Sequence, residues 1–331
     1  MIWFTWRQFR TPATITAGAL AVFAVVLLVS GNTITDLYSS VATCQSDCGN
    51  AVDAFLTQVR NGAGGTIYNA ALAVMYAAPP LIGVFWGAPL IAREIEAGTH
   101  RLAWNQSITR SRWLATKLAV VGGATALATG LPSWGVTTWA QRIDSAAADR
   151  ITPLVFGARG VVPIGYALFA FALGVTCGML IHRTVPAMAA TLGVYAVAVA
   201  SMPLWLRAHL MPARHETPAL DMGNLDALQI DQKGAMLVEP NAVANAWTVS
   251  NQTVTSSGQP FTGPADLTRC GRSAAIRGCD EWVGSLGLRQ DVVYHPDSHY
   301  WPLQWIEAGI FVALAALLAA VSFWWLRRRL S

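Results

Sequence analysis

Long apolar runs separated by polar segments dominate the chain. Six of these runs contain no Lys, Arg or Asp and hold a single Glu between them, and they cover residues 14–30, 67–92, 118–139, 162–181, 185–206 and 301–326. Because a helix rises about 1.5 Å per residue, roughly 20 apolar residues cross a hydrocarbon layer about 30 Å thick. The pattern therefore predicts an all-α polytopic membrane protein with six transmembrane helices.

The runs also divide the chain into three parts. Residues 1–206 are a predicted membrane domain with the first five helices, in which Met1 to Arg10 form a short helix in the membrane interface. Residues 207–300 are predicted to be a small extracellular module of mixed or irregular structure. Residues 301–331 hold the sixth helix and a basic cytoplasmic tail.

Local patterns refine two of these parts. In the extracellular module, residues 246–256 alternate β-branched and polar side chains, which favours a strand. A cleaved signal peptide is the alternative for the first apolar run. The run is long, however, and no A-x-A motif follows it promptly, so a membrane span is favoured.

The composition excludes other classes of protein. Of the 331 residues, 54% are hydrophobic and 12% are charged, and soluble domains carry about twice that share of charge. Disordered chains need low hydrophobicity and high net charge. The composition therefore excludes a disordered chain and argues against a cytosolic enzyme.

The distribution of basic residues predicts the orientation. With the N-terminus inside, the inner segments hold 11 basic and two acidic residues, whereas the longer outer segments hold 11 basic and 15 acidic residues. An excess of Lys and Arg marks cytoplasmic loops. Both termini are therefore predicted to be cytoplasmic. Membrane lipid is predicted to surround the spans. The formal net charge of +4 reflects this topology rather than binding to nucleic acid.

The cysteines fall into two outer pairs and one residue within a span. Cys44 and Cys48 lie in the first outer segment, Cys270 and Cys279 lie in the large outer module, and Cys177 lies in the fourth run. Outside a cell membrane thiols can oxidise, so two local disulfides are plausible, although four cysteines allow three pairings. Half a metal site at Cys44-x-x-x-Cys48 is the alternative, but no nearby histidine supports it.

Two further polar positions leave alternatives open. His295 and His299 are four residues apart, which suits a zinc pair, but Pro296 between them disfavours a shared helical face, so an interfacial loop is preferred. Glu307 lies near the start of the sixth run. It is predicted to be an interfacial carboxylate rather than part of a proton relay.

No catalytic motif is present in the chain. It contains no G-x-x-x-x-G-K-[ST] phosphate loop, no H-E-x-x-H and no G-x-S-x-G. No catalytic residue and no metal site are therefore predicted. Ion-coupled transporters usually carry ionisable groups within their spans, and these runs have almost none. Any work across the membrane is expected to be driven by another polypeptide.

Small residues at helical spacing predict close helix packing. Gly83 and Gly87 lie in the second run, and Gly174 and Gly178 lie in the fourth. The small-x-x-x-small pattern lets two helix backbones approach closely. Packing within one bundle is the preferred interpretation, and an interface between subunits is the alternative.

The stretch between the second and third runs carries the most information. Gly98 is expected to end the second helix, and Thr99 is expected to cap a short helix that runs to about Gln106. A further cap at Ser107 or Thr109 would start the third span. The short helix would be amphipathic, with Leu102 and Trp104 as apolar anchors and His100 and Arg101 as polar ones.

These residues resemble the membrane subunits of ATP-binding-cassette transporters of the type-2 exporter class. That class shows E-x-G-T at the end of the second span, then a short apolar helix, then T-P-V-S-R and a downstream Lys. The chain has Glu96, Gly98 and Thr99, then Q-S-I-T-R at residues 106–110, then Lys117. It departs from the pattern at residue 107, where Ser replaces the usual Pro. W-x-x-W-R at residues 3–7 and F-W-G-A-P-L-I-A-R-E at 85–94 resemble a branch from high-GC Gram-positive bacteria.

The resemblance implies how the subunit would work. Residues 99–106 are similar to the coupling helix, which docks on an ATPase subunit and transmits nucleotide-driven closure to the spans. The residues implied in this coupling are Glu94, Glu96, Gly98, Thr99, Arg101, Leu102, Trp104 and Arg110. A solvated loop, charged only for topology, is the alternative.

The resemblance also implies partners, location and cargo. Two copies of an ABC ATPase would bind ATP and Mg, with no cofactor in this chain, and a second copy or a paralogous permease would complete the complex. The complex would lie in a bacterial cell membrane and export a hydrophobic or amphipathic substrate such as a lipid, drug or peptide. The main alternative is a membrane sensor with an extracellular ligand-binding module. A membrane enzyme that uses His295 and His299 is a third possibility.

Overall fold

The chain folds into two compact units, which are described separately. The computed structural model describes residues 2–45, 48–98, 109–220, 225–230, 236–240, 243, 245–264, 266–270 and 276–328. Unit 1 comprises Met1–Ala147, Pro153–Arg207 and Trp301–Ser331, and unit 2 comprises Ala148–Thr152 and Ala208–Tyr300.

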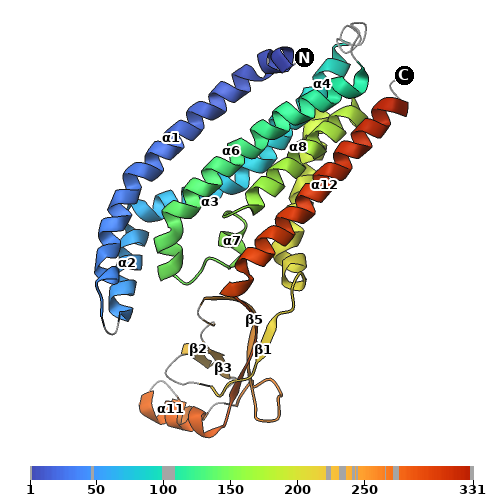
Figure 1. Ribbon diagram of the computed structural model, residues 1–331. Helices are drawn as coiled ribbons and strands as arrows, with labels where there is room; N and C mark the ends of the chain where they lie inside the picture. Colours follow the sequence, from blue (N-terminus) through green and yellow to red (C-terminus); the bar gives the residue numbers. More distant parts are fainter. Residues whose placement is uncertain are drawn as a thin grey trace. The chain divides into compact units, whose positions relative to one another are not determined.

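Unit 1 is helical (Figure 1). Its described elements are α1 (Ile2–Ala42), α2 (Gly49–Asn61), α3 (Ala63–Ile82), η1 (Gly83–Gly87), α4 (Ala88–Glu96), α6 (Arg110–Ala146), α7 (Pro153–Phe156), α8 (Val162–Ile181), α9 (Thr184–Ser201), η2 (Met202–Leu206), η3 (Arg207–His209) and α12 (Tyr300–Arg328). Within the described ranges, six segments are long and apolar enough to cross a membrane: Phe9–Ala42, Ala63–Glu96, Arg110–Ala146, Val162–Ile181, Thr184–His209 and Asp297–Arg328. The predicted six-span fold is therefore confirmed.

The first span is longer than its apolar run. The run covers residues 14–30, whereas α1 continues as one helix from Ile2 to Ala42. Residues 2–10 are therefore not a separate helix, because they lead directly into the span. Beyond α1, Cys44 and Cys48 form a disulfide, and α2 follows. Most of the first outer segment is thus helical, because hydropathy marks the part suited to lipid and not the end of the helix.

Two apolar clusters stabilise opposite parts of α1. Near its N-terminal end, Phe9 packs with Ile91 of α4, Trp113 of α6 and Leu326 of α12. Toward its other end, Ile34 belongs to a second cluster with residues of α2, α3 and α6. The start of α1, the junction of α4 with α6 and the end of α12 therefore lie at the same end of unit 1 (Figure 1).

α8 is buried on nearly every side and contacts the second span at very short range. A Cβ added at Gly87 would lie 2.5 Å from a carbonyl oxygen of α8, and one at Gly178 would lie 2.5 Å from a carbonyl oxygen of α4. Gly83 and Gly174 face each other in the same contact. Only hydrogen leaves room for such an approach. These four glycines thus let α8 pack closely against the second span within one bundle.

The second span changes helix type near its middle. Pro79 and Pro80 lie in the last turn of α3, and the wider π-helical segment η1 follows before α4 begins. Proline lacks a backbone N–H and cannot continue the usual hydrogen-bond ladder. A π segment re-registers the ladder locally. The fifth span has a similar segment, η2, which contains Pro203.

Unit 2 contains strands and short helices, which agrees with the predicted small module of mixed structure. Its described elements are β1 (Arg214–Glu216), β2 (Leu225–Ile230), β3 (Met236–Pro240), β4 (Ala246–Val254), α10 (Leu267–Cys270), α11 (Ile276–Ser285), β5 (Arg289–Pro296) and η5 (Asp297–His299). β5 lies between β1 and β4 in an antiparallel sheet, and β2 pairs with β3. β4 lies within the stretch of residues 246–256 that was predicted to be a strand.

A disulfide lies beside the small core of unit 2. Cys270 of α10 is bonded to Cys279 of α11, and Cys279 packs with Val283 and Leu288. Unit 2 is small, and small modules with limited cores commonly depend on such bonds.

Candidate functional site

The candidate site comprises the helix ends that flank residues 99–108. α4 ends at Glu96, and Gly98 follows with a φ of 68°, a left-handed conformation that glycine adopts without strain. At the other flank, the hydroxyl oxygen of Thr109 accepts a hydrogen bond from the backbone N–H of Arg112 at 3.4 Å. Thr109 therefore caps the start of α6. The sequence predicted the helix end at Gly98 and left Ser107 and Thr109 as alternative caps, of which Thr109 caps α6 in the structure.

A buried ion pair fastens α6 to α4. The Lys117 ammonium donates to Oε1 of Glu94 at 2.5 Å and to the Leu90 carbonyl oxygen at 3.2 Å, and it lies 4.6 Å from the centre of the Trp113 ring. The side chains of Lys117 and Glu94 are 1% and 13% exposed. Removing one partner of a buried pair costs about 3–5 kcal/mol, because the other charge is left unpaired. α4 and α6 are therefore expected to move together here.

Glu96 fastens α4 to the start of α9. Its Oε2 atom accepts hydrogen bonds from the backbone N–H of Thr184 at 3.1 Å and from the Thr184 hydroxyl at 2.7 Å. The N-cap residue of α9, Arg183, makes no side-chain capping bond. The Glu96 carboxylate thus supplies the negatively charged acceptor that a helix N-terminus favours. Through Glu94 and Glu96, α4 is joined to both α6 and α9.

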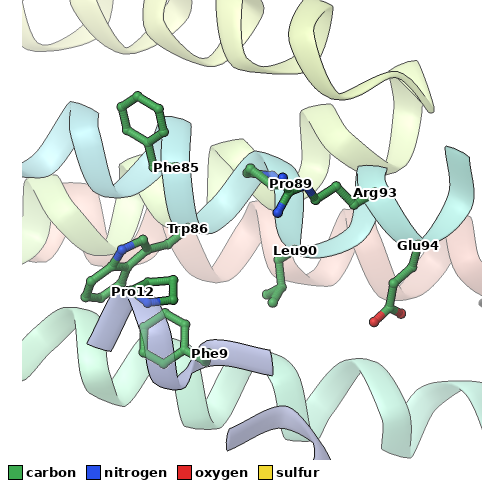
Figure 2. Close-up of a pocket in the computed structure, with 8 residues that line it drawn as sticks. All are labelled: Phe9, Pro12, Phe85, Trp86, Pro89, Leu90, Arg93 and Glu94. Carbon is green, nitrogen blue, oxygen red and sulfur yellow. The ribbon is translucent and has the colours of Figure 1, made fainter. Parts of the chain in front are cut away.

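A cavity of about 250 Å³ lies beside this junction (Figure 2). It is lined by Phe9, Pro12, Phe85, Trp86, Pro89, Leu90, Arg93 and Glu94. The rings of Phe9 and Trp86 meet edge to face, with centroids 4.7 Å apart. Figure 2 shows them grouped with Pro12 at one end and the carboxylate of Glu94 toward the other. An apolar wall with charge at one end suits the interface between lipid and water.

The structure describes half of the residues that were predicted to act in coupling. Glu94, Glu96 and Gly98 lie at the end of α4, and Arg110 is the first residue of α6. The other four, Thr99, Arg101, Leu102 and Trp104, lie outside the described residues. The short helix over residues 99–106 and its docking face therefore remain predictions.

Glu307 is not the interfacial carboxylate expected from the sequence. It is fully buried, and its Oε2 and Oε1 atoms accept from Nε and Nη2 of Arg207 at 2.7 and 2.9 Å. The Tyr166 hydroxyl also donates to Oε1. The expectation was wrong because Arg207, placed in the outer segment, folds back as the counter-charge. The sequence did contain a signal for this pair: a basic residue directly follows the fifth span, and an acid lies near the start of the sixth.

A second buried pair was also missed. Nε of Arg159 donates to Oδ2 of Asp144 at 3.1 Å, and the Tyr68 hydroxyl donates to Oδ1 at 2.6 Å. Asp144 lies near the end of α6, beyond the apolar run, and Arg159 lies in the turn before α8. Neither residue interrupts an apolar run, so the positions of the runs did not indicate this ion pair.

The histidine pair lies in unit 2. His295 belongs to β5 rather than to an interfacial loop and is fully buried. Its Nε2–H donates to the Ala208 carbonyl oxygen at 3.2 Å, and its Nδ1 lies 3.2 Å from Nδ1 of His299. Burial lowers the pKa of His295 below its ordinary value of 6.5. Within the described ranges, no group of three His, Cys, Asp or Glu side chains is placed to hold a metal ion.

Comparison of the chain with known protein families found a match. The family described as ABC-2 membrane transporter related matches residues 17–207, which is more than half of the chain. The matched range includes both flanks of the candidate site. No curated protein and no solved structure matches the chain.

Proposed function

Because the chain belongs to the ABC-2 membrane transporter related family, we propose that it is the permease subunit of an ATP-binding-cassette exporter. The family and the six apolar helices support a multi-pass transporter permease. The sequence has no phosphate-loop motif. In this proposal a separate ATPase subunit binds ATP and Mg²⁺ and supplies the energy.

One observation supports the proposal above the others: the end of α4, at the base of residues 99–108, is joined to both α6 and α9. Glu94 pairs with Lys117 of α6, and Glu96 accepts from Thr184 of α9. A loop charged only for topology needs no buried ion pair at its base. A loop that transmits force does need one, because movement of residues 99–108 would otherwise be lost in local bending.

The same links suggest how force would travel. Residues 99–106 would dock on the ATPase subunit through Leu102 and Trp104, with Arg101 at the edge of the contact. ATP binding would close the ATPase dimer and displace this segment. Because α4 is tied to both α6 and α9, the three helices would shift as one body. Such a shift would alternate access to a route between two permease copies.

The remaining features of the complex belong to the same proposal. Two ATPase copies would pair with two permeases, identical or paralogous, in a bacterial plasma membrane. Both termini would be cytoplasmic, and the grouping of Phe9 with Leu326 at one end of unit 1 supports a common side for them. The cargo would be hydrophobic or amphipathic, such as a lipid, drug or peptide, because the spans are apolar and aromatic.

Co-purification with a candidate ABC ATPase subunit from the same cell tests the proposal. The wild-type permease should retain that ATPase in detergent. Trp104→Ala should lower the retained amount at least tenfold, because a buried tryptophan is a typical interface anchor. Trp134→Ala is the matched control, since Trp134 is exposed on α6 and far from residues 99–108 in sequence. Equal retention by both variants, or no retention by the wild type, would refute the docking assignment.

A further inference from the structure

A second cavity, of about 300 Å³, lies in unit 1 among α3, α8, α9 and η2. Most of its lining is apolar, with Leu192 and Pro203 as examples. Its polar groups are three tyrosines and one arginine: Tyr76, Tyr166, Tyr195 and Arg207. An apolar wall with a few polar groups is typical of sites for small molecules, and this volume is at the lower end of their usual range.

Of the three tyrosines that line the cavity, one has a hydroxyl without a hydrogen-bond partner among the described residues. The Tyr166 hydroxyl donates to Glu307, and the Tyr76 hydroxyl donates to the Leu154 carbonyl oxygen at 2.8 Å. The Tyr195 side chain is 5% exposed, and its hydroxyl has no hydrogen-bond partner in the described part of the chain. A buried hydroxyl left unpaired costs stability. A ligand with an acceptor oxygen would remove that cost.

The arginine in the wall does not make the cavity an anion site. Nε and Nη2 of Arg207 donate to Glu307, and Nη1 donates to the Pro153 carbonyl oxygen at 3.0 Å. The charges of Arg207 and Glu307 cancel, and each guanidinium nitrogen already has an acceptor. A carboxylate or phosphate would therefore lose its hydration without gaining a free cation. The wall favours an uncharged polar group.

We propose that this cavity binds an uncharged amphiphile of the membrane, such as a long-chain alcohol or an acylglycerol. The Tyr195 hydroxyl donates a hydrogen bond to the ligand's hydroxyl or carbonyl oxygen, and the hydrocarbon chain lies against the apolar lining. Such binding needs neither ATP nor an ATPase. It therefore stands or falls independently of the proposed function.

Photolabelling of the purified full chain in phosphatidylcholine liposomes tests the site. The probes are a diazirine-bearing long-chain alcohol and a diazirine-bearing alkane of the same length. Both should label the peptide that contains residues 192–203. Tyr195→Phe removes only the hydroxyl, so it should weaken labelling by the alcohol about three- to tenfold, the size of one net hydrogen bond. Labelling by the alkane should stay unchanged.

A second pair of variants separates the cavity from the helix surface. Leu192→Trp places a large ring in the cavity and should reduce labelling by both probes at least fivefold. Val197→Trp is the control, because Val197 is exposed on the same helix and does not line the cavity. Thermal unfolding of each variant shows whether the fold is retained.

Three results would contradict the proposed binding site. The first is labelling outside residues 192–203, the second is an equal effect of Tyr195→Phe on labelling by both probes, and the third is unchanged labelling in Leu192→Trp. Tighter competition by the matching fatty-acid anion than by the alcohol would contradict the preference for an uncharged group.

Discussion

Arg207 and Glu307 are 100 positions apart in the chain and form a doubly hydrogen-bonded, fully buried ion pair. The pair joins the end of the fifth span to the start of the sixth. All of residues 208–300 are inserted between these two residues in the sequence. The pair therefore holds together, within unit 1, the two spans that flank the insertion in the sequence.

Removing Glu307 alone should destabilise the protein strongly. Glu307→Leu leaves the Arg207 guanidinium buried without a counter-charge, at a cost of about 3–5 kcal/mol. The double variant Arg207→Leu with Glu307→Leu should recover much of that loss, because neither charge remains. Denaturant unfolding of the wild type, both single variants (Glu307→Leu and Arg207→Leu) and the double variant in detergent measures both effects. A double variant whose loss equals the sum of the two single losses would show that the residues do not interact.

The contact between α8 and the second span should tolerate no added side chain. A Cβ at Gly174 would lie 2.7 Å from the Ala88 backbone nitrogen, so Gly174→Ala should cost about 1–3 kcal/mol through overpacking. Gly193 of α9 is the matched control, because nothing lies within 4 Å of its added Cβ. Gly193→Ala should be neutral or stabilise by up to about 1 kcal/mol. Thermal unfolding of the two variants side by side decides between these outcomes.

The buried histidine should make unit 2 sensitive to acid. Burial lowers the pKa of His295, whereas in the unfolded chain it titrates near 6.5. Below about pH 6.5 the unfolded state therefore binds a proton that the folded state does not. The free energy of unfolding consequently decreases as the pH is lowered. Unfolding midpoints between pH 8 and pH 5 should fall less for His295→Phe than for the wild type. Identical slopes for the two proteins would exclude His295 as the source.

The disulfides provide a test of orientation. Cys44, Cys48, Cys270 and Cys279 are paired, and the predicted topology places all four outside the cell. An impermeant reductant followed by an impermeant maleimide should therefore label them in intact cells. Cys177 lies within α8 and should stay unlabelled. Labelling that requires permeabilised cells would reverse the predicted orientation.

The sequence predicted those features that depend on neighbouring residues. The apolar runs located the six spans, since the length of an apolar run is a local property. Gly98 likewise marked the helix end, and Thr109 was one of the two residues predicted to cap the third span. The extension of α1 to Ala42 was not predicted, because its last turns are polar. Its packing there against α2 and α6 depends on the tertiary fold.

Contacts between distant residues could not be predicted in this way. Glu307 alone resembled an interfacial carboxylate, and only folding brings Arg207 beside it. The pairing of β1 with β5 across most of unit 2 is of the same kind. The resemblance implied a role in coupling for Glu94 and Glu96, but their partners, Lys117 and Thr184, became identifiable only in the folded chain.

The central claim is that force applied at residues 99–108 reaches α9 through Glu96. The most direct test is a distance measurement between spin labels at Val185 of α9 and Leu317 of α12, both exposed, in the permease–ATPase complex with and without ATP. We expect an ATP-dependent change in this distance in the wild type and in the control Glu281→Ala. Glu96→Ala should lose most of the change while ATP hydrolysis continues. If the change in Glu96→Ala equals that of the wild type, force does not reach α9 through Glu96.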